Sequence, residues 1–394
     1  MNKKDVVITG AARTPVGSFQ GVLSTESAPR LGSIAIKAAI EKSNIKPEDI
    51  DDVIMGCVLP AGMGQAPARQ AAIGANIPVS AGATTINKMC GSGMRSAMLA
   101  NDQIIAGSSS ISIAGGIESM SNAPYILPKV RTGLRMGHGD IKDHMFIDGL
   151  EDAYEPGRLM GTYAEDTAEA YQFTREQQDE FAIRSLKRAK IANEDGSFKN
   201  EIVPVQIKTR KGETEISNDE QPFTADISKI PNLRPAFRKD GTVTAANSSS
   251  ISDGAAALVL MTLKEAEKRN LRPLARIISH STYSQEPAWF TTAPIGAIKK
   301  VLDKANWKIG DVDLFEINEA FAVVPMAAMK DLSLSPDIVN VHGGACALGH
   351  PVGTSGARII ATLINALEKY NLHKGIASLC IGGGEATAIA IEKF

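Results

Sequence analysis

Cys90 lies in a pattern that could make its thiol a nucleophile. Residues 87–94 read Asn-Lys-Met-Cys-Gly-Ser-Gly-Met and fall between a strand-like apolar stretch and a helical pattern. A cysteine at a helix N-terminus has its pKa lowered by the helix dipole and by free N–H groups. Gly91 and Gly93 would let a bulky thioester approach the sulfur closely. The plainer alternative is a buried structural cysteine, the commoner role of an arbitrary cysteine.

His350 is a second candidate for a catalytic residue, because it lies in a glycine-rich loop that is expected to turn sharply. Residues 340–358 hold five glycines between a strand-like stretch and a helical pattern. Gly349 and Pro351 restrict the backbone on either side of the imidazole. A histidine beside a thiol can accept its proton and so activate it. Taken alone, a loop histidine is more often an ordinary surface residue.

Two more strand ends carry groups suited to carbonyl chemistry. Cys380 ends an apolar stretch and is followed by a glycine triplet that begins at Gly382. The backbone N–H groups of such a turn could line an oxyanion hole. Asn318 also follows a strand-like stretch, and its amide could hold a water or a substrate oxygen. A phosphate-binding loop is excluded, because neither G-x-G-x-x-G nor a Gly-Lys-Ser/Thr pattern occurs in this segment.

The chain contains a faint internal repeat. Three short matches occur in the same order at offsets of 262, 263 and 267 residues, pairing 44–52 with 306–313, 92–95 with 355–358, and 115–118 with 382–385. Pseudo-twofold symmetry would bring the loops of Cys90 and His350 to equivalent sheet ends. Chance similarity between two α/β units is the alternative that stays open.

Each copy reads as strands alternating with helices, which is typical of βαβ units on a mostly parallel sheet. In the first copy we expect strands at Val6–Thr9, Val53–Met55, Thr84–Ile86 and Ser110–Ala114, and helices at Gly32–Ser43, Ala66–Ala75 and Gly93–Ala106. In the second we expect strands at Ala275–Ser279, Leu314–Ile317, Ile338–Val341 and Ile376–Cys380, and helices at Pro294–Ala305, Ala320–Leu332 and Gly356–Tyr370.

The region between the copies differs in composition. It is richer in charge, proline and glycine, and it holds one strongly helical stretch, Ala164–Asn193, with a capping box at Thr174–Gln177. We therefore expect an inserted loop domain at 121–245. The N-terminal half would comprise 1–120 and 246–270, and the C-terminal half 271–394.

Composition narrows the class of protein. The chain has 394 residues and a formal net charge of -2, which argues against a dedicated nucleic-acid binder. No apolar run approaches the length of a membrane helix, and Met1–Asp5 starts no signal-peptide pattern. The four cysteines show no metal-type spacing, so we expect free thiols in a reducing, cytoplasmic compartment.

Together these motifs resemble the thiolase family along essentially the whole chain. The matching segments are Thr14–Gly17, the Cys90 motif, Gly115–Met120, Asn247–Gly254, Asn318–Phe321, Gly349–Pro351 and Cys380–Gly382. The resemblance implies an α/β fold of the duplicated, five-layered thiolase type. It would have two similar βαβ-type halves with mixed sheets, plus the inserted loop domain.

The resemblance also implies site roles. Cys90 would be acylated by an acyl-CoA after His350 removes its proton, and Cys380 would abstract the α-proton of the second substrate. Asn318 would hold a water that completes one oxyanion hole with His350, while the N–H groups of Cys90 and Gly382 form the other. No metal or prosthetic group is implied, since coenzyme A is substrate and product. His138, His144 and Asp148 are only loosely ligand-like, and a solvated loop explains them better.

The family match also points to substrate contacts. Ser249 would contact the pantetheine arm, with helix capping as its alternative, and Met160 would lie near the acyl pocket, with core packing as its alternative. Ala320 and Phe321 belong to the Asn318 motif and complete the substrate set. The chain departs from the family where Leu159 replaces a frequent histidine.

A second group of departures lies nearer the C-terminus. His342 stands where many members of the family have asparagine. Glu385 and Ala386 follow the glycine triplet, where methionine or glutamine and then glycine are commoner in the family. Cys57 and Cys346 read as buried structural thiols.

The expected activity is that of an acetyl-CoA C-acetyltransferase, which condenses two acetyl-CoA reversibly and places the chain in fatty acid metabolism. A 3-ketoacyl-CoA thiolase of broader chain length is the alternative. A decarboxylating ketoacyl synthase and a non-catalytic lipid-binding relative are more distant ones. The expected partners are acyl-CoA and CoA, with no nucleic acid and no membrane. The resemblance implies a homotetramer, a dimer of dimers, because in the family the stretch 121–148 supports tetramer assembly and lies near the entrance for CoA. A plain solvated loop is equally consistent with the basic charges of this stretch.

Overall fold

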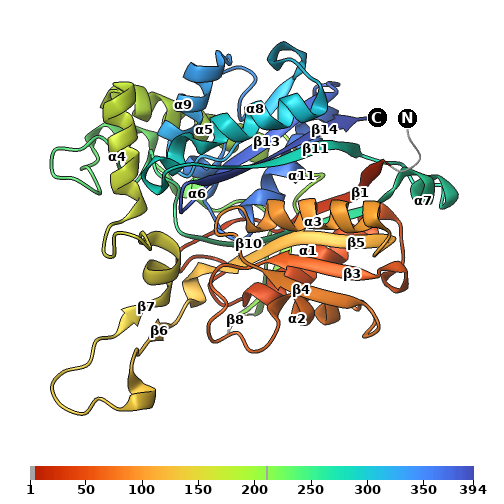
Figure 1. Cartoon of the computed structure of the whole chain (residues 1–394), viewed down its shortest axis with the longest axis horizontal. Coiled ribbons are helices and arrows are strands. Elements are labelled where there is room, and N and C mark those ends of the chain that lie inside the picture. The colour runs from red at the N-terminus through yellow and green to blue at the C-terminus, as the bar shows by residue number, and fades with distance from the viewer. Residues whose placement is uncertain (1–4, 210–211) are drawn as a thin grey trace.

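The computed structural model describes residues 5–209 and 212–394. Two α/β halves lie one above the other, with the C-terminal half in blue over the red and orange N-terminal half (Figure 1). Residues 1–4, where no signal-peptide pattern was found, lie outside the described residues. Within the described part, no helix is both long and apolar enough to cross a bilayer.

The N-terminal half alternates strands and helices, as its apolar periodicity predicts. Its elements are β1 (Val6–Arg13), β2 (Gly17–Ser18), α1 (Ala28–Ser43), β3 (Asp52–Gly56), α2 (Pro67–Gly74), β4 (Gly82–Ile86), α3 (Ser92–Ala106) and β5 (Ile111–Ser119). The chain returns to this half with β10 (Ser252–Thr262), which lies between β1 and β5.

The C-terminal half repeats this order. After the short α7 (Leu263–Lys268) come β11 (Ala275–Ser284), α8 (Ala293–Ala305), β12 (Leu314–Ile317), α9 (Val323–Leu332), α10 (Ala345–Leu348), α11 (Ser355–Lys369), β13 (Lys374–Ile381) and β14 (Glu385–Lys393). Helices α3 and α11 hold matching places in the two halves, which is the arrangement that the sequence repeat predicts.

The strands form a mixed sheet system. Among the described residues, ten strands join in the order β12-β13-β14-β11-β1-β10-β5-β3-β4, with β2 paired to β10. Within this sheet of described residues, the strands of the two halves are joined only by the short pairing of Val7 and Ile8 with β11. The pairs β3–β4, β3–β5 and β12–β13 are parallel, and the others are antiparallel. The expectation of a mostly parallel sheet is therefore wrong, whereas mixed sheets are confirmed.

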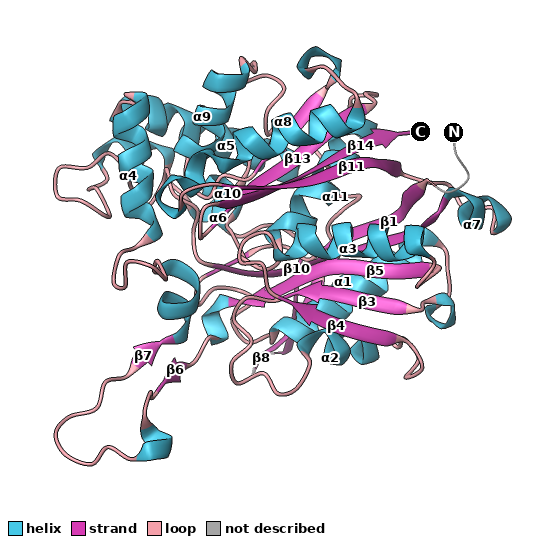
Figure 2. Cartoon of the chain, viewed as in Figure 1, coloured by secondary structure: helices cyan, strands magenta, loops and turns pink. Residues whose placement is uncertain are grey.

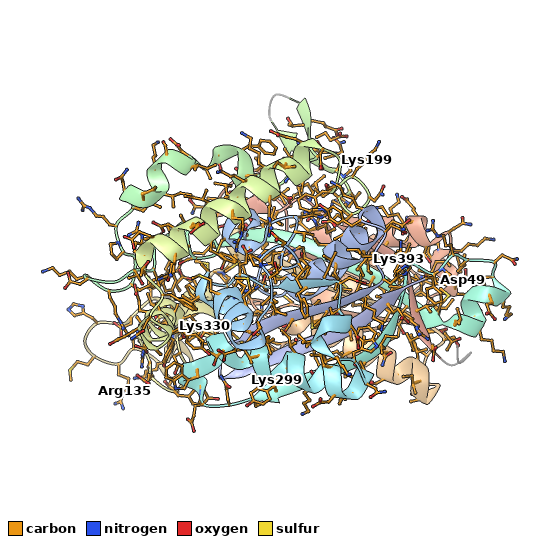
Figure 3. All side chains as sticks on the ribbon, turned by 90° about the horizontal axis from the view of Figure 1, so that it is seen from above. Asp49, Arg135, Lys199, Lys299, Lys330 and Lys393 are labelled. Atoms are coloured by element: carbon orange, nitrogen blue, oxygen red, sulfur yellow. The ribbon has the colours of Figure 1, made fainter. Side chains whose placement is uncertain are left out.

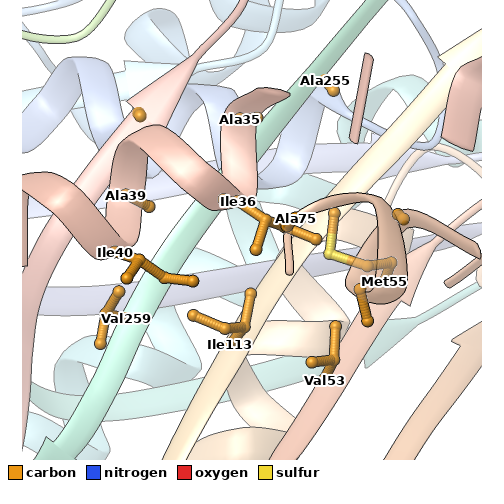
Figure 4. Packing of buried hydrophobic residues seen from close by; sticks show 14 of the residues in the cluster. Ala35, Ile36, Ala39, Ile40, Val53, Met55, Ala75, Ile113, Ala255 and Val259 are labelled. Carbon is orange, nitrogen blue, oxygen red and sulfur yellow. The ribbon is translucent and has the colours of Figure 1, made fainter. Parts of the chain in front are cut away.

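Successive side chains along a strand point to opposite faces of the sheet and pack against different helices, which gives the fold five layers. Val53 packs outward against α1 and α2, while its neighbour Ile54 faces a central layer formed by α3 and α11. Figure 4 shows Ile36 and Ile40 of α1 against Val53, Ile113 and the β10 residue Val259. In the C-terminal half, α8 and α9 cover the outer face. The layers are thus helix, sheet, helix pair, sheet, helix (Figure 2).

The two central helices meet where each carries a glycine. A Cβ on Gly93 of α3 would lie 2.8 Å from the backbone nitrogen of Ala357, and a Cβ on Gly356 of α11 would lie 2.2 Å from that of Met94. Both distances are below van der Waals contact, so only glycine permits this approach. The Ser-Gly pairs of the repeat therefore bring the helix N-termini together, and with them the segments that precede each helix.

The inserted region contains fewer regular elements. They are the hairpin strands β6 (Tyr125–Ile126) and β7 (Lys142–Asp143), the helices α4 (Met160–Tyr171), α5 (Arg175–Glu194) and α6 (Gln221–Thr224), and the strands β8 (Val205–Thr209) and β9 (Gly212–Ile216). The hairpin β6–β7 and its loop project from the body in Figure 1. Residues 210–211 lie outside the described residues.

Two expectations about elements are wrong, and two strands were missed. The single helix expected over 164–193 is two helices, because Gln172 takes a left-handed backbone (φ 56°) and Thr174 then caps α5. The strand expected at Ile338–Val341 is only a bridge between Phe315 and Val339. Strands β10 and β14 were not predicted; β10 is buried on both faces, so it lacks the alternation that marks a half-exposed strand.

Candidate active site

An apolar cavity of about 380 Å³ lies where the halves and the inserted region meet. Segments far apart in sequence form its wall, and they include seven of the nine predicted site residues: Cys90, Met160, Ser249, Ala320, Phe321, His350 and Gly382. Cys380 and Asn318 lie behind this wall, fully buried. The structure therefore brings together at one cavity residues that the sequence only suggested would meet.

Cys90 lies in the short segment between β4 and α3. Its neighbour Met89 has a left-handed backbone (φ 47°), which turns the chain sharply before Gly91 caps α3. Burial raises the pKa of Cys90 to about 11, although the N–H groups of Gly382 and of Cys90 itself act to lower it. The lowered pKa expected from the helix terminus is thus reversed by burial. In the resting protein Cys90 is a thiol, so a base must activate it.

Cys380 lies at the end of β13, directly behind the glycine turn. Its side chain is fully buried, and burial together with the nearby Cys90 raises the pKa of Cys380 well above its ordinary value. An electrostatic effect of this kind requires the two sulfurs to be near one another. Two thiolates would repel, so only one of the two sulfurs ionises readily at a time.

His350 is held by hydrogen bonds on its backbone and on one ring nitrogen. Its backbone N–H donates to the carbonyl of Ser250 (3.1 Å), and its Nδ1 lies 2.6 Å from the hydroxyl oxygen of Ser355. Its Nε2 is buried and has no hydrogen-bond partner among the described residues. Burial, assisted by the positive charge of Arg358, lowers the pKa of His350 to about 3. The resting imidazole is therefore neutral and has one ring nitrogen available.

Asn318 follows β12, and a buried arginine orients its amide. Arg358 donates to the Asn318 Oδ1 (3.4 Å), while the Asn318 Nδ2 is buried without a partner in the described part of the chain. Arg358 also pairs with Glu316 (3.4 Å) in the same buried layer. Because the oxygen is occupied, Nδ2 is the atom that remains able to donate to a water or to a substrate oxygen.

The glycine turn joins β13 to β14 and presents a backbone donor. Gly383 and Gly384 have positive φ values of 90° and 86°, which side-chain-bearing residues rarely adopt. This turn aims the N–H of Gly382 at the sulfur of Cys90. A Cβ on Gly382 would lie 3.6 Å from the Met160 Sδ, so the turn packs directly on the predicted acyl pocket.

The cavity wall also contains residues that the sequence reading missed. Most of them are apolar side chains that the inserted region contributes, and the wall includes Phe146, Leu150, Leu159, Phe237 and Phe290. Isolated aromatic residues in a loop-rich segment carry no periodic signal, so no pattern could have marked them. The Ser249 N–H donates to the carbonyl of Ala320 (2.9 Å), which aligns two predicted substrate residues along the wall.

Glu118, at the end of β5, ties two loops of the site together. Its Oε2 accepts from the N–H groups of Val58 (2.9 Å) and Gly353 (2.8 Å), and its Oε1 accepts from that of Leu59 (3.1 Å). Burial raises its pKa to about 7, although these donors lower it. The carboxylate anchors the His350 loop to the end of β3.

The other cysteines and histidines considered from the sequence lie outside the wall of this cavity. Cys57 and Cys346 are buried, and neither lines the main cavity. The His144 Nδ1 lies 2.7 Å from Asp148, whereas His138 is exposed on the projecting loop. Within the described residues, no three His, Cys, Asp or Glu side chains are grouped to hold a metal ion.

Comparisons with known proteins show the family of the chain. Family models described as thiolase N-terminal domain and thiolase C-terminal domain match residues 6–264 and 271–393. An acetyl-CoA acetyltransferase of Rhizobium meliloti (strain 1021) is 47% identical over 395 residues, covering 100% of both chains. One from Chromobacterium violaceum is 48% identical over 391 residues, covering 99% of this chain and 100% of the relative.

Solved structures show the same likeness. The crystal structure of the Bacillus anthracis acetyl-CoA acetyltransferase matches with a TM-score of 0.96 at 43% identity, covering 99% of each chain. A solved structure of the acetyl-CoA acetyltransferase from Syntrophomonas wolfei matches with a TM-score of 0.95 at 40% identity, also covering 99% of each chain. Fold and relatives thus define the class of protein, an acyltransferase enzyme. More particularly, the chain belongs to the thiolase family.

Proposed function

We propose that this chain is an acetyl-CoA C-acetyltransferase, which condenses two acetyl-CoA to acetoacetyl-CoA and CoA in a reversible Claisen reaction. The observation that carries the proposal is that one cysteine, one histidine and one backbone donor line a single apolar cavity, with a second cysteine directly behind its wall and close enough to the first to affect its own pKa. The names of the similar proteins support it.

In the first half-reaction the Cys90 sulfur attacks the thioester carbon. The free Nε2 of His350 takes the thiol proton as the sulfur–carbon bond forms. The N–H groups of Cys90 and Gly382 face the charge that develops on the carbonyl oxygen. The bond to the CoA sulfur breaks, and this sulfur takes a proton from Cys380. Acetyl-Cys90, a protonated His350 and a Cys380 thiolate remain.

Acylation itself prepares the second base. A Cys90 thiolate would raise the pKa of Cys380 further, and acylation prevents that thiolate from forming. The Cys380 thiolate takes the α-proton of the second acetyl-CoA. The Nε2–H of His350 and a water held by Asn318 stabilise the enolate oxygen. The carbanion attacks acetyl-Cys90, and the departing Cys90 sulfur takes the proton from His350, which restores the starting state.

The proposal needs no metal or prosthetic group, because thiols and an imidazole move every proton. Ser249 and Met160 would meet the pantetheine arm and the acyl group along the cavity wall. The basic side chains of the projecting loop, which are Lys129, Arg131, Arg135 and Lys142, would lie near the phosphates of CoA. The chain continues from this loop directly into the cavity residue Phe146.

We extend the proposal to a homotetramer in which the projecting hairpin contacts other copies. Its exposed side chains include Tyr125, Leu127, Leu134, Ile141 and Met136, the last 97% exposed. Figure 3 shows Arg135 of this loop at the outer edge of the molecule. Apolar groups gathered on a projecting loop favour burial against a partner. Replacing Leu134 and Met136 with glutamate should lower the mass measured by light scattering. An unchanged mass would contradict this assembly.

A cytoplasmic compartment and a place in fatty acid metabolism complete the proposal. Cysteines that must cycle between thiol, thiolate and thioester have to stay reduced. All four cysteines are free in the described part of the chain.

Acylation is the step that tests the proposal. Mixed with acetyl-CoA alone, the protein should gain one acetyl group at Cys90, seen by mass spectrometry of the digested chain. Cys90→Ser should abolish this adduct, whereas the control Cys346→Ser should keep it. An intact chain that forms no adduct would be a binding protein rather than an enzyme. An adduct that condenses only with a malonyl donor would indicate a ketoacyl synthase.

Chain length needs a separate measurement. Leu159, Phe237 and Phe290 give the cavity an apolar wall, which a longer acyl chain could also occupy. The proposal expects a higher kcat/KM for acetoacetyl-CoA than for 3-ketooctanoyl-CoA in the cleavage direction. The reverse order would make the chain a 3-ketoacyl-CoA thiolase of broader specificity.

A further inference from the structure

Ser355 is a buried serine in direct contact with His350. It is the first residue of α11, fully buried, and its hydroxyl lies between a ring nitrogen and a carbonyl oxygen. The Oγ is 2.6 Å from the Nδ1 of His350 and 3.1 Å from the carbonyl oxygen of Pro351. A hydroxyl has one proton to donate and two lone pairs with which to accept. The direction of these two bonds therefore decides which ring nitrogen of His350 carries hydrogen.

Only one placement of the protons makes both contacts of the Ser355 hydroxyl hydrogen bonds. The Pro351 carbonyl can accept but not donate, so the Ser355 proton must point toward it. The Oγ then accepts from an Nδ1–H of His350. This leaves a lone pair on Nε2, the ring nitrogen that has no partner among the described residues. Reversing the bond would place hydrogen on Nε2, where it could not take a proton from Cys90.

We propose that Ser355 is the positioning residue that holds His350 as its Nδ1–H tautomer, so that Nε2 is the base for Cys90. The same bond persists when His350 is protonated, because Nδ1 donates to the Ser355 Oγ in both states. The serine therefore serves both half-reactions without any heavy atom moving.

Because Ser355, the partner of His350, is uncharged, it also suits the step in which His350 returns its proton to Cys90. In a Ser-His-Asp triad the partner is a carboxylate, which stabilises the imidazolium ion. In this chain the partner is a hydroxyl, and the charged group that acts on His350 is the cationic Arg358, which opposes protonation of the ring. The histidine thus holds a proton only while a thiolate is nearby. This inference rests on the proposed role of His350 as base.

The tautomer can be read in the unaltered protein. The ¹⁵N shifts of the ring nitrogens, assigned with His350→Gln, should show Nδ1 protonated and Nε2 bare at neutral pH. A bare Nδ1 in the wild-type protein would overturn the inference, whatever any variant does. This measurement needs no substitution at position 355, so it does not depend on whether a buried variant folds.

The rate of acylation tests whether the contact between Ser355 and His350 matters for catalysis. Ser355→Ala should slow the burst of CoA release that reports acylation, on the order of 10-fold to 100-fold, with KM for acetyl-CoA nearly unchanged. Ser355→Thr keeps the hydroxyl and should recover most of the rate. The control Ser281→Ala removes another buried hydroxyl, which donates to the Ala297 carbonyl, and should acylate at the wild-type rate.

The outcomes separate the inference from the proposed function. Wild-type acylation in Ser355→Ala would overturn the role of Ser355, and so would equal loss in Ser355→Thr with both variants folded. Normal acylation in His350→Gln would instead contradict the role proposed for His350.

Discussion

Lys88 and Glu385 form an ion pair that spans the two halves of the molecule, with 2.6 Å between Nζ and Oε2. Lys88 lies in the segment that carries Cys90, and Glu385 follows the glycine turn that carries Gly382. The pair therefore links the nucleophile to its backbone donor. The Ser284 hydroxyl also donates to Glu385 (3.1 Å), so the carboxylate is held from both sides.

A double-mutant cycle measures this link. Lys88→Met and Glu385→Gln should each lower the free energy of unfolding, with a coupling energy of about 0.5 to 1 kcal/mol, because both side chains are only partly exposed. Urea unfolding of the two single variants and the double variant gives the coupling. It should shrink in 1 M salt, which screens exposed charges. Losses that simply add in the double variant would show that the two side chains do not interact in solution.

The assignment of separate roles to the two sulfurs predicts a split between half-reactions. Cys380→Ala should still form acetyl-Cys90, but condensation should fall by at least about 100-fold, because no group removes the α-proton. Rapid-quench measurement of the adduct and coupled assay of acetoacetyl-CoA separate the two steps. Cys90→Ala should lose both, and equal loss of both steps in Cys380→Ala would contradict the separate roles of the two sulfurs.

The contact between the central helices predicts a large loss of stability. Gly356→Ala places a Cβ 2.2 Å from the backbone nitrogen of Met94, so α3 and α11 must separate. We expect a loss of about 2 to 4 kcal/mol in urea unfolding. Gly310→Ala is the matched control, since nothing lies within 4 Å of its Cβ position. The helix contact is not critical if the two variants unfold at the same urea concentration.

His342 predicts a pH dependence of stability. It is buried with neither ring nitrogen hydrogen-bonded among the described residues, and burial, aided by Lys369, lowers its pKa to about 4. The unfolded chain binds this proton more readily, so stability is complete above about pH 6.5 and falls as the pH drops toward 4. The full loss is on the order of 3 kcal/mol.

His342→Phe isolates this contribution. The ring packs against Phe198 (5.7 Å between centroids) and Tyr370 (5.6 Å), and phenylalanine preserves those contacts. The variant should lose less stability than the wild type between pH 7 and pH 5 in urea unfolding. His350 also has a lowered pKa, but it is present in both proteins and cancels in the difference. The exposed His138→Asn serves as control, and parallel curves for His342→Phe and wild type would refute the argument.

Local sequence patterns predicted many of the helices and strands, but not which neighbouring strands are parallel and which are antiparallel. Helix α5 begins where the capping box at Thr174 predicts, because capping depends on residues three apart. The same local pattern predicted α4 and α5 as one helix. Gln172, whose left-handed backbone separates the two helices, is not a residue type that usually ends a helix. Strand β14 is the second strand of a hairpin whose turn is three consecutive glycines, and the sequence pattern suggested that those glycines belong to a site, not to a connection between strands.

By itself the sequence determined that Cys90, Cys380 and Asn318 end or follow strands and that His350 lies in a glycine-rich loop, because composition and spacing set local structure. Only the tertiary structure decided that they meet, with Cys90 and His350 in the cavity wall and Cys380 and Asn318 behind it, since convergence depends on two glycines letting α3 and α11 touch. It also decided their protonation, because burial raises the pKa of both thiols and lowers that of His350. Desolvation depends on what surrounds a group, and no local sequence pattern encodes that.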